Sequence, residues 1–251
     1  MNTTLAAGIV SACLFLAVIL GTWIRRLLPQ HHLTSDTKDT VKLAMGLVAT
    51  MSALLLGLLV SSAKGSYDTT RGQVIQMAAK VAFLDRVLAV YGPEAVEVRR
   101  QFRAAAEEGV RRMWPGEANQ PAQLTPNAHA GDAVYTAIQA LSPRDDTQRA
   151  LKTQAATLAV ELAQLRTLVL VQSVSSISRP LLIMVVSWLV AIFLSFSLLA
   201  PPNATANLAL MVAALSVAGA IFLILEMDHP FSGLIQVPSE PMLNAIKQLI
   251  P

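Results

Sequence analysis

The residues with the clearest chemical potential form a stripe of small and hydroxylated side chains in the apolar segment 41–63. Gly46, Thr50, Ala53, Gly57 and Ser61 recur every three or four positions, so a helix places them along one face. Small side chains leave room beside a helix, and hydroxyls can coordinate a partly dehydrated ion. This face therefore predicts the lining of a water-filled ion path.

Two lysines, Lys42 and Lys64, lie at the ends of this stripe. Positive charges at the mouths of a narrow path raise the local concentration of anions, so the pattern favours anion conduction. The alternative is a ridge for close helix–helix packing, with both lysines anchored among lipid headgroups. The two interpretations are compatible if the packing is between subunits around an axis.

Metal-ligating residues are sparse. Glu226 and Asp228 are weak candidates for a cation site, but they are two positions apart and face different ways on a helix. We interpret them as part of a helix-end turn before Pro230. His31 and His32 are adjacent, so their side chains diverge, and a solvated interfacial loop is the better interpretation. The sequence therefore predicts neither a metal site nor a cofactor.

Enzyme motifs are missing from the sequence. It contains no GxSxG and no GxxxxGK[ST] pattern, so neither a nucleophile elbow nor a P-loop is present. Its one cysteine, Cys13, leaves no disulfide framework and no cysteine zinc site, and we expect that side chain to pack inside an apolar segment. The sequence predicts a protein that is not an enzyme.

The composition identifies a membrane protein. Of the 251 residues, 54% are hydrophobic and only 14% are charged, and the mean hydropathy is +0.53. A soluble domain usually carries about 25% charged residues. The formal net charge of +3 is small, which argues against a nucleic-acid partner. The lipid bilayer is the partner that this composition demands.

Four segments are long and apolar enough to cross a bilayer, which requires about 20 residues of helix. They predict an all-α fold with two membrane hairpins, in residues 1–63 and 180–226, whose spans are 5–23, 41–63, 180–200 and 208–225. Segment 64–179 between the hairpins is polar and predicts an extramembrane helical domain. Segment 227–251 follows as a C-terminal tail.

The central segment shows helical periodicity. Apolar residues at 74, 77, 81, 84, 88 and 91 share one face, and Gly92-Pro93 predicts the end of that helix. A second seam at 151, 155, 158, 162, 165 and 169 is typical of coiled-coil-like packing. Apolar character then rises without interruption, so residues 147–200 are interpreted as one helix bent at Pro180.

Three stretches resemble the bacterial bestrophin-like family of uncharacterised membrane proteins: residues 31–68 (HHLTSDTKDTVKLAMGLVATMSALLLGLLVSSAKGSYD), 83–94 (FLDRVLAVYGPE) and 214–241 (ALSVAGAIFLILEMDHPFSGLIQVPSEP). The family is distantly similar to bestrophins, which are pentameric anion channels with two membrane hairpins and a cytoplasmic helical domain. This chain lacks the acidic cluster after the last span and the aromatic pore neck of bestrophins.

The resemblance implies a function and a location. It implies a homo-oligomer, with a pentamer favoured by resemblance alone, that carries inorganic ions across a bacterial inner membrane. Basic residues are divided almost evenly between the two sides of the spans, so charge alone does not set the orientation, and it is the resemblance that places the central domain in the cytoplasm. The predicted function is an ion channel, with the segment 41–63 lining the pore. The alternative is a membrane-anchored helical scaffold or sensor without transport.

Overall fold

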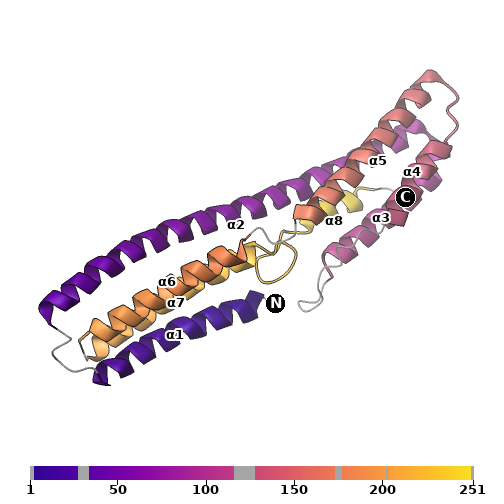
Figure 1. Cartoon of the computed structure of the whole chain (residues 1–251). Coiled ribbons are helices and arrows are strands. Elements are labelled where there is room, and N and C mark those ends of the chain that lie inside the picture. The colour runs from indigo at the N-terminus through magenta and orange to yellow at the C-terminus, as the bar shows by residue number, and fades with distance from the viewer. Residues whose placement is uncertain (1–2, 28–33, 116–127, 173–176, 202, 250–251) are drawn as a thin grey trace. The chain divides into compact units, whose positions relative to one another are not determined.

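A computed structural model describes residues 3–27, 34–115, 128–172, 177–201 and 203–249. Within these ranges no strand occurs, which confirms the predicted all-α class. The elements are α1 (Thr3–Leu27), α2 (Ser35–Tyr91), the 3-10 helix η2 (Pro93–Ala95), α3 (Val96–Met113), α4 (Ala128–Ala140), α5 (Asp146–Gln172), α6 (Arg179–Leu199), α7 (Ala204–Met227) and α8 (Glu240–Lys247) (Figure 1).

The chain divides into two compact units. The first unit comprises Met1–Gly65 and Ser175–Asp228, and the second comprises Ser66–Val174 and His229–Pro251. Helix α2 contributes to both, because its 57 residues continue without interruption from the predicted span into the polar segment. The sequence predicts the two parts of this helix separately and gives no sign that they are continuous.

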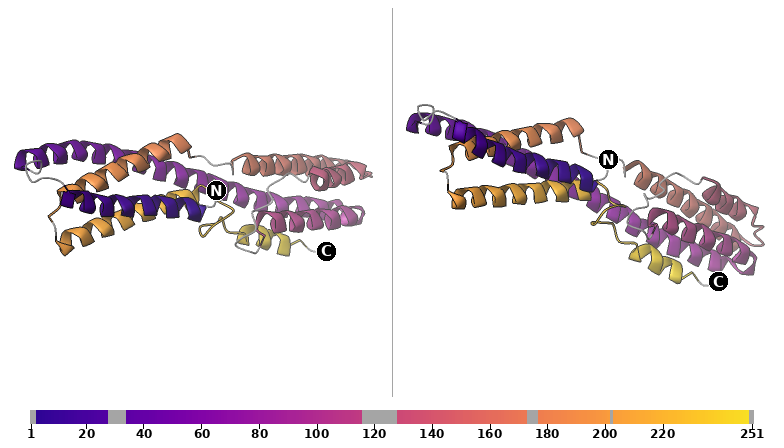
Figure 2. Two further views of the ribbon diagram at one scale, coloured as in Figure 1. Left: turned by 60° about the horizontal axis from the view of Figure 1, so that its bottom comes forward. Right: turned by 90° about the horizontal axis from the view of Figure 1, so that it is seen from below.

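In the first unit, α1 packs against α6 and α7, so its main neighbours come from the far end of the chain (Figures 1 and 2). Its core is mainly aliphatic, and it includes Leu14 and Val18 on α1, Val185 on α6 and Ile221 on α7, all of them fully buried. Aliphatic side chains fill this space without leaving polar atoms unsatisfied.

Five of the described helices are long and apolar enough to cross a membrane: α1, α2, α5, α6 and α7. Four of them contain the predicted spans, and α5 is the least apolar of the five. Helix α5 belongs to the second unit and carries Glu161, which forms an ion pair with Lys80 of α2 at 2.5 Å. By length and composition α5 is thus a fifth helix able to cross a membrane, whereas the sequence analysis assigns it to the extramembrane domain.

The predicted single helix over residues 147–200 is wrong. Helix α5 ends at Gln172, and α6 begins at Arg179 after an extended Ser178 with φ −65° and ψ 112°. Proline has no amide hydrogen to leave unpaired and is therefore well suited to the first turn of a helix. Pro180 therefore starts α6 instead of bending a longer helix.

The second unit is built around the two predicted apolar seams. All six residues of the first seam, including Val74 and Leu88, are buried on α2, and Ala155, Leu158 and Val169 are buried on α5. Helix α2 ends at Tyr91 as the Gly92-Pro93 pair predicts, and Gly92 has φ +123°, a conformation that favours glycine.

The C-terminal segment 227–251 is built into the second unit from His229 onward, although the sequence pattern presents it only as a tail. Trp114 Nε1 donates a hydrogen bond to the Val237 carbonyl at 2.8 Å, and its ring meets Phe231 edge-on with centroids 5.5 Å apart. Met242 and Ile246 of α8 are buried in the same core. These contacts join residues more than 100 positions apart, which periodicity cannot reveal.

Candidate functional site

The stripe predicted from the sequence lies on the part of α2 that belongs to the first unit. The side chains of Thr50, Ala53 and Ser61 are exposed, as is Gly57, whereas Gly46 is half-buried. The opposite side of the helix is buried through Ser52, Leu59 and Ala63. At about 100° per residue, the stripe is centred about 140° around the helix from this buried face.

Neither glycine of the stripe contacts a neighbouring helix. A Cβ atom built on Gly46 or Gly57 would meet no atom within 4 Å. Small residues at a packing ridge normally let another backbone approach to contact distance. Among the described residues the two glycines therefore make no such contact, and a packing role for them would require a second chain.

Helix α2 is the apolar helix that the single chain covers least. In its most apolar 18-residue window only 11% of the residues are buried, compared with 33% in α1 and 28% in both α6 and α7. Beside the stripe, a row of large apolar side chains is also exposed, with Leu43, Leu47, Leu54 and Leu58 between 59% and 78% accessible. Lipid or another chain must cover these leucines, because a continuous row of large apolar side chains is unfavourable in contact with water.

The hydroxyl of Thr50 donates a hydrogen bond to the Gly46 carbonyl at 2.9 Å. Its single proton is therefore used by the helix itself, and what it presents to the surroundings is a methyl group and oxygen lone pairs. Lone pairs coordinate cations and not anions.

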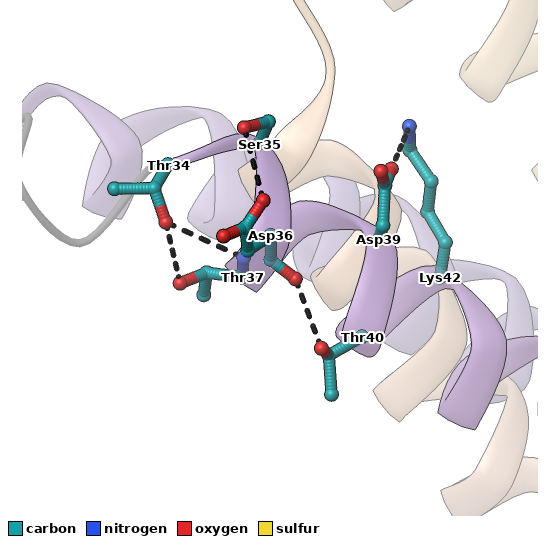
Figure 3. A network of polar contacts seen from close by, with 7 residues as sticks. All are labelled: Thr34, Ser35, Asp36, Thr37, Asp39, Thr40 and Lys42. Carbon is teal, nitrogen blue, oxygen red and sulfur yellow. Dashed lines mark hydrogen bonds and ion pairs between the residues drawn. The ribbon is translucent and has the colours of Figure 1, made fainter.

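Figure 3 shows the first turns of α2, where Lys42 lies. Thr34 caps the helix, because its Oγ1 accepts a hydrogen bond from the Thr37 amide at 3.3 Å. Lys42 lies 3.3 Å from Asp39, and both side chains are more than 60% exposed. This pairing partly offsets the positive charge at this end, and at the other end Lys64 is also exposed.

The weak cation candidates Glu226 and Asp228 are both buried, at the end of α7. Within the described residues, no three His, Cys, Asp or Glu side chains come together in a geometry that could hold a metal ion. His31 and His32 lie outside the described residues. The expectation that Cys13 packs inside the protein is wrong for the single chain, in which this side chain is exposed.

A close helix contact that the sequence analysis missed lies between α1 and α6. A Cβ on Gly21 would approach the Leu194 carbonyl oxygen to 2.7 Å and Ser197 Cβ to 2.8 Å. Beside it, Ser197 donates to the Val18 carbonyl at 2.5 Å, and the Thr22 and Ser197 hydroxyls are 3.0 Å apart. The signal was present as Ala17 and Gly21, a pair of small residues four positions apart.

The fold and the exposed apolar helices define a helical membrane protein. The family model described as "Bestrophin-like domain" matches residues 12–242, so the chain belongs to the Bestrophin-like family, as its sequence motifs predict. No curated protein matches the chain.

The solved structures with this fold include bacterial bestrophins. Two variants of a bacterial bestrophin homologue from Klebsiella pneumoniae match with TM-scores of 0.70 and 0.69, each at 13% identity. The first match covers 97% of both chains, and the second covers 99% of this chain and 98% of the other. A structure described as a membrane protein matches with a TM-score of 0.71 over 96% of each chain, also at 13% identity. At this identity the comparison establishes the fold alone.

Proposed function

We propose that this protein is a homo-oligomeric ion channel of the bacterial inner membrane in which the stripe on α2 lines the pore. The observation that carries the proposal is that, in the part of the chain that the structure describes, no atom lies within 4 Å of a Cβ built on Gly57, on an apolar helix that the single chain leaves largely uncovered. Several copies of α2 gathered around an axis would bury the exposed leucines against lipid or neighbouring chains. The small residues would then face the axis and leave an opening.

The proposed channel favours anions through its mouths. The hydroxyl of Thr50 donates to its own helix, so selectivity would depend on the charges of Lys42, Asp39 and Lys64. A mouth charge acts by local enrichment of ions and is screened by salt. Anion preference should therefore be stronger at low ionic strength than at high ionic strength.

The test is ion flux into liposomes that contain the purified protein. Gly57→Leu adds a four-carbon side chain that would block a path only a few ångströms wide. Gly219→Leu is the matched control, because Gly219 is an exposed glycine of α7 that also has no atom within 4 Å of a built Cβ. We expect flux from the native protein and the control, and none from Gly57→Leu, with the oligomer mass unchanged in all three.

Charge variants test the selectivity. Lys64→Glu should lower the anion preference without abolishing flux, and Asp39→Asn should raise it by removing the carboxylate beside Lys42. An unchanged selectivity in a correctly assembled Lys64→Glu would overturn the anion assignment. A native protein that is a monodisperse monomer in mild detergent, or that passes no ion, would favour the membrane-anchored scaffold instead.

A further inference from the structure

The packing face of α1 ends in an arginine. Leu14, Val18 and Gly21 lie on the side of α1 that is buried in the first unit. At about 100° per residue, Arg25 falls on the same side one turn beyond Gly21, whereas Arg26 points about 100° away from it. The structure agrees with this placement, because Arg25 is half-buried and Arg26 is exposed. A cation therefore occupies a position that packing within the unit otherwise gives to small or apolar residues.

Arg25 also lies at the end of the apolar part of the first unit. One turn before it, Gly21 packs against Ser197 of α6, and α6 ends two residues later at Leu199. The end of α1 and the turn between α6 and α7 lie at the same end of this unit (Figures 1 and 2). Trp23, which is 58% exposed, belongs to a residue type that is enriched where a membrane meets water. We therefore expect Arg25 at the level of the phospholipid headgroups.

The chain does not satisfy the guanidinium of Arg25. Its Nη1 atom is buried and has no hydrogen-bond partner among the described residues. The sequence contains no acidic residue before Asp36 and none in residues 179–225, so α1, α6 and this end of α7 supply no carboxylate. On α2, Asp39 is occupied by Lys42 at 3.3 Å. The anion that would balance Arg25 must therefore come from outside these helices.

The physical chemistry of a half-buried guanidinium indicates which anion fits. A cation that has lost part of its hydration gains most from an anion at the edge that remains accessible. The planar donors of a guanidinium match two oxygens of a phosphate group. At the headgroup level of a bilayer, phospholipids present this group in quantity.

We propose that Arg25 forms a binding site for a phosphate group that is carried by an anionic phospholipid. The guanidinium would hold the phosphate at the end of α1, while the acyl chains remain in the surrounding bilayer. The exposed Arg26 would stay hydrated and contribute only general attraction, which salt screens. The inference depends on the assignment of α1 to the membrane and not on ion conduction.

Native mass spectrometry of the full-length protein in mild detergent measures the site. The probe is phosphatidylglycerol, and the comparisons are phosphatidylcholine, diacylglycerol and inorganic phosphate. We expect one phosphatidylglycerol to be retained per chain, and phosphatidylcholine to be retained more weakly because its choline group offsets the phosphate charge. Diacylglycerol lacks the phosphate and should not occupy the site. Excess inorganic phosphate should not displace the lipid, because it has no acyl chains that gain free energy from leaving water.

Two neighbouring arginines offer a matched comparison, because Arg25→Gln and Arg26→Gln remove the same charge from adjacent positions. Arg25→Gln should lower the affinity for phosphatidylglycerol about tenfold, whereas Arg26→Gln should change it less than about twofold. Arg25→Lys should restore only part of the affinity, because an ammonium group cannot donate two parallel hydrogen bonds. Circular dichroism and oligomer mass identify any variant that fails to fold, and the comparison of lipids on the native protein then carries the test.

Four results would overturn the proposal. Equal losses in the two glutamine variants would indicate general attraction without a site at Arg25. Equal retention of phosphatidylglycerol and diacylglycerol would remove the role of the phosphate, and displacement by inorganic phosphate would assign the site to free phosphate. An oligomer structure with a carboxylate of a second copy on Arg25 would make the partner a protein. None of these measurements uses ion flux, so the lipid site and the proposed channel succeed or fail separately.

Discussion

Two glycines of the first unit should respond in opposite ways to the same substitution. Gly21 lies in the contact between α1 and α6, whereas Gly57 faces open space on α2. We expect Gly21→Ala to destabilise the fold of the chain itself. We expect Gly57→Ala to leave that fold intact, because its environment in the single chain has room for the added methyl group.

The structure sets the magnitude of the change in folding free energy expected at each glycine. At Gly21 the new Cβ would lie 2.7 Å from the Leu194 carbonyl oxygen and 2.8 Å from Ser197 Cβ, so one helix must move. Overpacking of this kind costs about 1–3 kcal/mol, which is roughly a five- to 150-fold change in the folding equilibrium. At Gly57 there is no steric cost, and helix propensity favours alanine by about 1 kcal/mol.

The assay is reversible unfolding in mixed micelles at several protein concentrations. Destabilisation by Gly21→Ala should be independent of concentration, because the contact lies within one chain. Any effect of Gly57→Leu should depend on concentration, because only a neighbouring chain can meet the larger side chain. The reasoning is refuted if Gly57→Ala destabilises the dilute protein as much as Gly21→Ala does.

Three further predictions concern the topology and the second unit. Single cysteines at Asn203 and Ser142, in a variant without Cys13, should label from opposite faces of intact cells, and labelling from one face would end the four-span arrangement. Asp85→Asn should destabilise the protein by about 3 kcal/mol in denaturant titrations. The substitution removes the negative charge that lies 2.8 Å from the guanidinium of Arg99, whose side chain is only 16% exposed. The pKa of Glu97 is lowered to about 2 by hydrogen bonds from Arg100 and Gln101. The stabilisation that the ionised Glu97 carboxylate gives to the folded state should therefore be complete above pH 4.5 and should disappear as the pH falls toward 2. The carboxyl group of Glu97 should titrate by NMR with a midpoint near 2.

The membrane class, the helical fold and the two seams of the second unit could be predicted from the sequence. Each depends on local composition or on helical periodicity, which neighbouring residues encode together. The end of α2 at Tyr91 was also predictable, because Gly92 and Pro93 impose backbone geometry at that position. The residues that form the stripe on α2 could also be identified from the sequence, but the atoms that surround the stripe could not.

Only the tertiary structure decided which small residues are in contact. Gly21 and Gly57 look alike in sequence, since each belongs to a series of small residues four positions apart. Whether another backbone approaches depends on the packing of α1 against α6, whose contacting residues are about 175 positions apart. The burial of the C-terminal segment arises in the same way. Spacing along a helix determines which face a residue occupies, and only long-range packing determines what that face meets.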